Sequence, residues 1–149
     1  MRTKEVQATW TGTSPASAST AVSTTPVNGL EKWDGVVIDA VITGGTGGTI
    51  DVYLQRKIAS NVWADWVHFP QVAAATTKRY TTMVTGHGAG TTPTEIGVGT
   101  DASPSVVLAA NTSTNVPPTG QVRVVMVGGA GTSAGATQTI YFTPFTERV

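Results

Sequence analysis

The residues that could perform acid–base or metal chemistry are few in this sequence: two histidines, nine acidic residues and no cysteine. The absence of cysteine excludes disulfides, thiolate metal sites and a cysteine nucleophile. His68 and His87 are too few for an ordinary zinc site unless the fold adds carboxylates, and no His-Glu-x-x-His or His-x-His spacing occurs. We expect His68 to lie in a strand, on the face opposite Val67 and Phe69, and His87 to lie in a glycine-rich loop. The sequence therefore predicts no metal site and no cofactor.

The motifs of common enzyme sites are missing or misplaced. The glycine-rich stretch at residues 44–48 has the composition of a phosphate-binding loop, but it leads into the strand-like Thr-Ile-Asp-Val and not into a helix. No Gly-x-Ser-x-Gly nucleophile motif occurs. The carboxylates of the central region are scattered, with no spacing that brings two of them into one cleft: Asp34, Asp39, Asp51, Asp65, Glu95 and Asp101. We therefore expect no enzymatic activity.

The chain has little charge and no excess of either sign. Nine basic residues balance nine acidic ones, and charged residues make up 12% of the sequence, about half of the ~25% typical of soluble domains. The basic residues form only two adjacent pairs, at 56–57 and 78–79, which are typical of solvated strand ends and too few to neutralise a nucleic-acid backbone. No apolar stretch approaches the roughly 18 residues of a membrane helix, and no apolar signal segment follows the charged N-terminus. We expect a soluble protein with no nucleic-acid or membrane partner.

Hydrophobic periodicity favours strands throughout, since no segment keeps the apolar spacing of a helix. Alternation predicts strands at residues 5–11, 36–43, 50–57, 62–69, 79–84, 106–110, 121–127 and 137–142. The strand at 50–57 is expected to have one face in water, because two sets of residues alternate along it: Ile50, Val52 and Leu54 against Asp51, Tyr53 and Gln55. The glycines at 44–48 predict a hairpin between the strands on either side.

Short strands separated by turn signals predict an all-β fold, a single domain over residues 1–149 built as a β-sandwich or jelly roll. Residues 1–26 are expected to form an extended N-terminal arm, whose Ser/Thr/Ala-rich part at 13–26 could be a weak strand or a linker. Residues 86–118 form a long Gly/Thr/Pro-rich loop, which we expect to lie on a neighbour, with 106–110 paired into a sheet.

The aromatic residues are the best candidates for a binding surface. Four tryptophans, three tyrosines and three phenylalanines could form a stacking platform for sugars, form a contact surface for protein, or fill the core. Trp63 and Trp66 are three residues apart, so in a strand they lie on opposite faces and one of them is expected outside the core or at a turn. That outward tryptophan is the leading candidate for an interface anchor. The candidate interface residues are therefore Trp63, Trp66 and the loop residue His87.

Three segments carry a resemblance to a known group of proteins. Residues 48–55 read Gly-Thr-Ile-Asp-Val-Tyr-Leu-Gln, residues 62–67 read Val-Trp-Ala-Asp-Trp-Val, and residues 122–127 read Val-Arg-Val-Val-Met-Val. In this order, a Gly-Thr-x-Asp-Val strand, a tryptophan-containing hairpin and a late Val-Arg-Val strand, the chain resembles the small jelly-roll virion proteins of tailed bacteriophages. The resemblance covers residues 36–85 and 121–142, and the chain departs from it at the N-terminal arm and at the 86–118 loop.

The resemblance implies a capsid decoration or cement protein, located on the capsid surface of the virion. Its partner would be the major capsid protein, and it would form a homo-oligomer, with a trimer favoured. Low charge and the absence of a catalytic motif agree with such a role. Two alternatives stay open: a carbohydrate- or receptor-binding module of a phage tail fibre or a secreted enzyme, and another virion part such as a tail or neck component.

Overall fold

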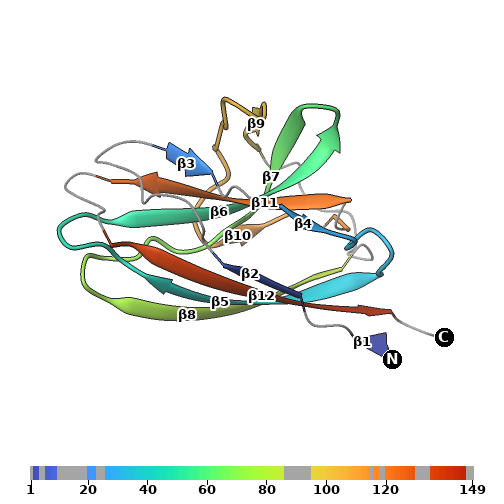
Figure 1. Cartoon of the computed structure of the whole chain (residues 1–149), viewed down its shortest axis with the longest axis horizontal. Helices are drawn as coiled ribbons and strands as arrows, with labels where there is room; N and C mark the ends of the chain where they lie inside the picture. The colour runs from blue at the N-terminus through green and yellow to red at the C-terminus, as the bar shows by residue number, and fades with distance from the viewer. Residues whose placement is uncertain are drawn as a thin grey trace.

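The structure, a computed structural model, describes residues 2–3, 6–9, 20–22, 26–85, 95–114, 116–117, 120–129 and 135–146. Within these ranges it contains strands and no helix, and the strands form two antiparallel sheets, one of five strands and one of seven. The two sheets lie in separate layers (Figure 1). The predicted all-β fold is therefore confirmed.

The five-stranded sheet forms the lower layer in Figure 1, with the order β1-β12-β5-β8 and with β2 also paired to β12. Its strands are β1 (Arg2–Thr3), β2 (Val6–Thr9), β5 (Gly35–Thr43), β8 (Thr77–Thr85) and β12 (Thr137–Thr146). β5 pairs with β12 on one side and with β8 on the other, with no register shift. This regular pairing fixes which side chains point toward the other sheet.

The seven-stranded sheet has the order β10-β7-β6-β11-β3, with β4 paired to β11 and β9 paired to β7. Its strands are β3 (Thr20–Val22), β4 (Val27–Asn28), β6 (Ile50–Ala59), β7 (Val62–His68), β9 (Val98–Gly99), β10 (Thr112–Ser113) and β11 (Gln121–Gly128). β6 and β7 form a hairpin whose turn includes Asn61 at a φ of 56°. Asparagine is one of the few residues other than glycine that adopts this left-handed conformation at low cost.

Alternating apolar side chains from both sheets form one shared core. They include Val36, Ile38, Ala40 and Ile42 of β5, Ile50, Val52 and Leu54 of β6, Val122, Val124 and Met126 of β11, and Ile140 and Phe142 of β12. These are the sets that period-two alternation places on one face of each strand. The inward faces of these four strands are thus predictable from the sequence.

The glycine-rich stretch at 44–48 is not a hairpin, so that prediction is wrong. β5 and β6 belong to different sheets, and the stretch carries the chain from one layer to the other. Gly44 packs so tightly against residues 73–74 that a Cβ on it would lie 2.1 Å from the carbonyl oxygen of Ala73. Gly44 therefore permits a close approach to the backbone of residues 73–74.

The predicted strand at 106–110 is also absent. Residues 95–114, which we call the excursion, run back over the chain's own seven-stranded sheet and pair with β7 only through β9 and β10. The described part of the long 86–118 loop thus packs on the chain's own sheet, where we had expected it to lie on a neighbour. In the predicted N-terminal arm, the described strands β1, β2 and β3 likewise pair within the chain.

Candidate functional site

The outer face of the seven-stranded sheet, which points away from the core, is covered by the excursion. The excursion appears at the top of Figure 1, where β9 lies beside the β6–β7 hairpin. Beneath it, Gln55 is 0% exposed and Tyr53 is 8% exposed. The expectation that this face of β6 lies in water is therefore wrong, because a segment distant in sequence shields it.

The Asp65 carboxylate is the centre of the contact between β7 and the excursion. Its Oδ2 atom accepts hydrogen bonds from the backbone amides of Gly97, Val107 and Leu108 at 2.8, 2.8 and 2.9 Å. Its Oδ1 atom accepts one from Nε2 of Gln55 at 2.8 Å. Asp65 is 0% exposed, and a buried carboxylate needs such donors to replace the water it has lost. One side chain thus anchors two separate parts of the excursion.

A second set of contacts joins Arg123 of β11 to β6 and to the tip of the excursion. Nε and Nη2 of Arg123 donate to Oε1 of Gln55 at 3.0 and 2.8 Å. The guanidinium lies 4.5 Å from the centroid of the Trp63 ring, and the indole N–H of Trp63 donates to the carboxylate of Asp101. Burial lowers the pKa of Arg123 to about 10, although the charges of Asp101 and Asp65 favour its protonated form. Arg123 therefore keeps its positive charge at neutral pH.

We refer to these side chains as the outer-face cluster: Gln55, Trp63, Asp65, Asp101 and Arg123. Its buried charges are paired with hydrogen-bond partners from the chain itself. Such a network specifies one arrangement of the segments that it joins, because any other leaves a buried charge without a partner.

A β-bulge turns His68 onto the same outer face. The register between β6 and β7 shifts at Trp66, and both Trp66 and Val67 join the core. His68 therefore points outward, opposite Val67 as expected, and its ring stacks on Tyr53 with the centroids 3.7 Å apart. Its Nδ1 lies 2.7 Å from a backbone carbonyl of the excursion and its Nε2 lies 3.1 Å from Oδ1 of Asp51. With both ring nitrogens engaged, His68 is a structural link and not an available base.

Asp51 lies at the rim of this contact. Burial by itself raises the pKa of Asp51, but hydrogen bonds from His68 and from Gln71, the latter at 2.7 Å, together with the charge of a protonated His68, hold it below 3.8. The neighbouring Tyr53 is affected in the opposite sense: burial, and then the charges of Asp51 and Asp65, raise its pKa to about 12. Both shifts favour the forms already present at neutral pH.

The two tryptophans that the sequence predicts as interface residues are buried. Trp63 and Trp66 do lie on opposite faces of β7, but Trp63 is 2% exposed under the excursion and Trp66 is 0% exposed in the core. The indole N–H of Trp66 donates to the carbonyl of Val116 at 3.0 Å. The expectation of an outward tryptophan available as an anchor is therefore wrong. His87 lies outside the described residues.

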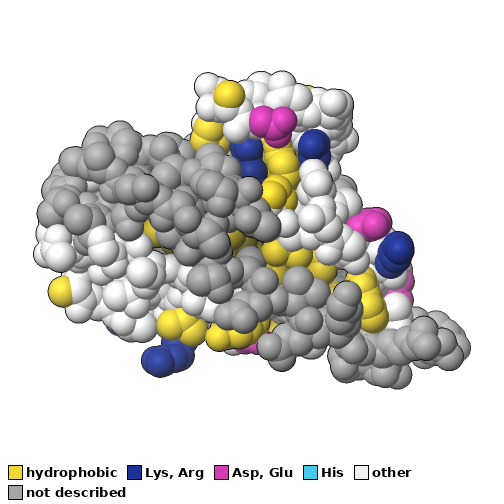
Figure 2. Space-filling view, viewed as in Figure 1, with side chains coloured by type: hydrophobic (Ala, Val, Ile, Leu, Met, Phe, Trp, Pro, Cys, Tyr) yellow, Lys and Arg dark blue, Asp and Glu magenta, His cyan; other side chains and the backbone are white. Residues whose placement is uncertain are grey.

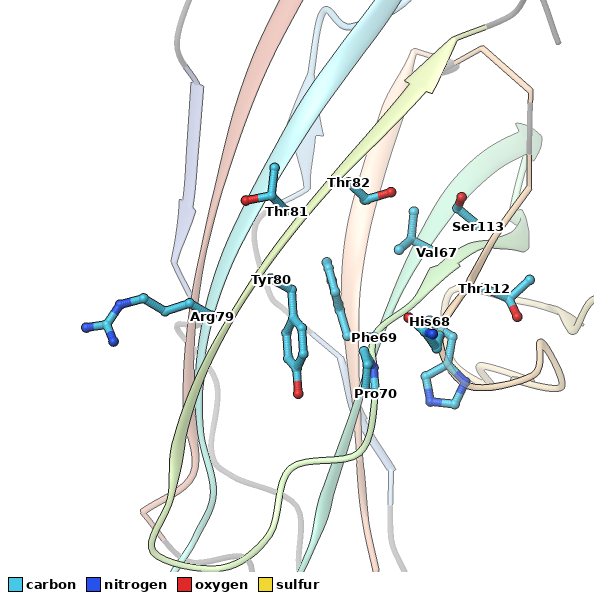
Figure 3. Close-up of a pocket in the computed structure, with 11 residues that line it drawn as sticks. Val67, His68, Phe69, Pro70, Arg79, Tyr80, Thr81, Thr82, Thr112 and Ser113 are labelled. Atoms are coloured by element: carbon cyan, nitrogen blue, oxygen red, sulfur yellow. The ribbon is translucent and has the colours of Figure 1, made fainter.

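A groove opens at one edge of the molecule, between β8 of the five-stranded sheet and β7 and β10 of the other (Figure 3). Its volume is about 290 Å³, and it is lined by Val67, His68, Phe69, Pro70, Arg79, Tyr80, Thr81, Thr82, Asn111, Thr112 and Ser113. The rings of Phe69 and Tyr80 stack with their centroids 5.9 Å apart. Burial raises the pKa of the Tyr80 hydroxyl, which therefore stays a neutral donor.

The outer face of the five-stranded sheet is a broad surface of low charge, which we call the open sheet face. By strand register it carries Val37, Asp39 and Val41 of β5, Arg79, Thr81 and Met83 of β8, and Thr139, Tyr141 and Thr143 of β12. All of these residues are exposed or half-buried, and Met83 is 61% exposed. The Asp39 carboxylate accepts a hydrogen bond from the Thr81 hydroxyl at 2.6 Å.

Among the described residues, no group of three His, Cys, Asp or Glu side chains could hold a metal ion. The ionisable groups of the outer-face cluster are already engaged in holding the excursion. In the same part of the chain, no helix is long and apolar enough to span a membrane.

Comparison with known proteins adds no relative: no protein-family model, curated protein or solved structure matches the chain.

Sequence reasoning missed the outer-face cluster, although a signal for it exists. Asp65 and Arg123 each interrupt an otherwise apolar or aromatic strand segment, and Gln55 follows one; alternation assigns all three to the outer face. Three polar residues of this kind on neighbouring strands indicate either a wet face or a covered one. Whether the face is exposed to water or covered depends on the path of the excursion, which no local sequence pattern reveals.

Proposed function

We propose that this chain is a structural virion protein of a tailed bacteriophage, a jelly-roll decoration or cement protein that binds the major capsid protein on the capsid surface. In this role it acts as a homo-oligomer, with a trimer favoured, and stabilises the head through contacts between subunits. The resemblance of residues 36–85 and 121–142 to small jelly-roll virion proteins supports the proposal, as does the confirmed all-β fold.

The observation that carries the proposal is the contrast between the two outer faces. On the seven-stranded sheet, the outer-face cluster holds the chain's own excursion in place through hydrogen bonds. On the five-stranded sheet, the open sheet face presents Met83, half-buried valines and threonines with few charges. Figure 2 shows that charged side chains on the side in view are isolated spots and not a single-sign patch.

Such a surface suits a broad contact with another protein. Burial of Val37, Val41 and Met83 against a partner removes apolar area from water, and the absence of clustered charge limits the cost of desolvation. We therefore place the contact with partner proteins on the open sheet face. The sequence had suggested the long loop and an exposed tryptophan for this contact.

Two measurements on the purified protein test the proposal. We expect analytical ultracentrifugation to give the mass of a homo-oligomer, and cosedimentation with expanded phage capsids to give saturable binding. A monomer that stays in the supernatant at every capsid concentration would contradict the proposal.

A further inference from the structure

The groove between β8 and β10 has the lining of a site for an uncharged ligand. Figure 3 shows Arg79 and Thr81 pointing away from the groove, on the far side of β8, whereas Tyr80 and Thr82 point toward Phe69 and Val67. No carboxylate lines it, and the His68 ring nitrogens are held by Asp51 and by the excursion. A metal ion would therefore find no opposite charge inside, and an anion would meet only Arg79, whose guanidinium points away from the groove.

The groove does offer hydrogen bonds. The hydroxyls of Tyr80, Thr82 and Ser113 and the side-chain amide of Asn111 line it, and none has a hydrogen-bond partner within the described part of the chain. Each hydroxyl can donate and accept, and the amide does both through separate atoms. A ligand that matches them must carry several closely spaced groups that also donate and accept.

The same groove has an apolar wall. The half-buried ring of Tyr80 stands in this wall beside Pro70, and behind it packs the ring of Phe69, which is 3% exposed. An aromatic wall beside neutral hydrogen-bonding groups suits a molecule with both an apolar face and hydroxyls, which describes a sugar ring. The volume of about 290 Å³ lies at the small end of ligand pockets, so it suits one or two rings and not a long chain.

We propose that this groove binds a neutral saccharide of one or two rings. Tyr80 contacts the apolar face of a ring beside Pro70, while Thr82, Asn111 and Ser113 exchange hydrogen bonds with its hydroxyls. The site is distinct from the open sheet face, because Tyr80 and Thr82 alternate with the residues of β8 that lie on that face. It does not depend on attachment to a capsid.

A glycan array carrying neutral and acidic oligosaccharides tests the proposal with the full-length protein. We expect binding to one or more neutral glycans, and we expect no binding that requires a sialyl or sulfate group. Tyr80→Ala should weaken the best interaction by about tenfold or more, and the matched Tyr141→Ala, which changes a tyrosine of the open sheet face, should leave it unchanged.

Two smaller changes separate a loss of binding from a loss of folding, in case Tyr80→Ala does not fold. Thr82→Val keeps the shape of the side chain and removes its hydroxyl, and Asn111→Gly suits the left-handed φ of 58° at this residue. We expect each to weaken binding severalfold with an unchanged circular dichroism spectrum. An array without any neutral ligand, binding only to acidic glycans, or full binding by Tyr80→Ala and both of these variants would each overturn the proposal. Capsid binding measured on the same samples reports separately on the structural role.

Discussion

Asp65 links β7 to three backbone amides of the excursion and to the amide of Gln55. The excursion pairs with β7 only through two short strands, so the charge-assisted hydrogen bonds of this buried carboxylate are a large part of what holds it. Loss of this acceptor should be costly, because two of the three amides that it satisfies, those of Gly97 and Leu108, belong to buried residues.

Asp65→Asn keeps the size of the side chain but removes its charge and turns an NH2 group toward other donors. We expect the free energy of unfolding to fall by about 3–5 kcal/mol, since breaking a buried charged network leaves partners unsatisfied. Urea denaturation measures this change. The matched Asp39→Asn keeps an oxygen that can accept the single exposed bond from the Thr81 hydroxyl, and should cost about 1 kcal/mol or less. Equal effects of the two substitutions would contradict the role of Asp65.

The Asp51 carboxylate makes the free energy of unfolding depend on pH in the acidic range. Its pKa in the folded protein is below 3.8, so its carboxylate stabilises the fold above that pH, and this contribution is lost as the pH falls further and the group takes up a proton. We expect the wild type to be more stable than Asp51→Asn at neutral pH and the difference to shrink as the pH falls below about 4. Urea denaturation of both proteins at a series of pH values tests this. A difference that stays constant to pH 2 would refute it.

At the scale of elements, the sequence predicts the central strands well and the covering segment poorly. β5, β6, β8, β11 and β12 follow from alternation, because each has a buried face whose pattern is local. The path of the excursion depends on hydrogen bonds between residues more than 30 positions apart, such as Gly97 with Asp65. No local pattern encodes such a contact, so the covered face of β6 was expected in water.

The candidate site was predicted only in part from the sequence, for the same physical reason. Spacing alone places Trp63 and Trp66 on opposite faces, which is correct, but whether an outward side chain is exposed depends on what lies over it. The excursion provides that cover for Trp63, which pairs with Gly99 and donates to the carboxylate of Asp101. The groove is also missed, since it forms where two sheet edges meet.

Gly97 tests the close contact within the excursion. A Cβ at this position would lie 2.3 Å from the carbonyl oxygen of Ser105, so Gly97→Ala must displace backbone. We expect a loss of about 1–3 kcal/mol and faster hydrogen exchange of the Val107 and Leu108 amides, whose acceptor is Asp65. Gly120→Ala, where a Cβ meets only a side-chain atom at 3.9 Å, is the control and should change neither quantity measurably. Unaltered exchange in Gly97→Ala would show that the excursion is held in another way.

At the scale of the whole molecule, one sheet face is covered by the chain's own excursion and the other is the proposed contact with a partner. Met83 is the most exposed of the large apolar residues described, at 61%. Met83→Lys should leave stability within about 0.5 kcal/mol of the wild type, because the site is exposed, and should weaken capsid binding by about tenfold or more, because a charge enters the contact. Val107→Lys places the same charge at a residue that is 47% exposed on the excursion, and should bind normally. Cosedimentation with expanded capsids compares the three proteins, and parallel behaviour of the two lysine variants would exclude the open sheet face.

The most direct test of the central claim is an electron-microscopy reconstruction of expanded capsids incubated with the purified protein. We predict added density at symmetric positions on the outer surface, at the seams between capsid subunits, with the five-stranded sheet toward the capsid and the excursion toward solvent. A reconstruction that shows a bare lattice at saturating protein concentration would contradict the claim that this chain works by coating a capsid.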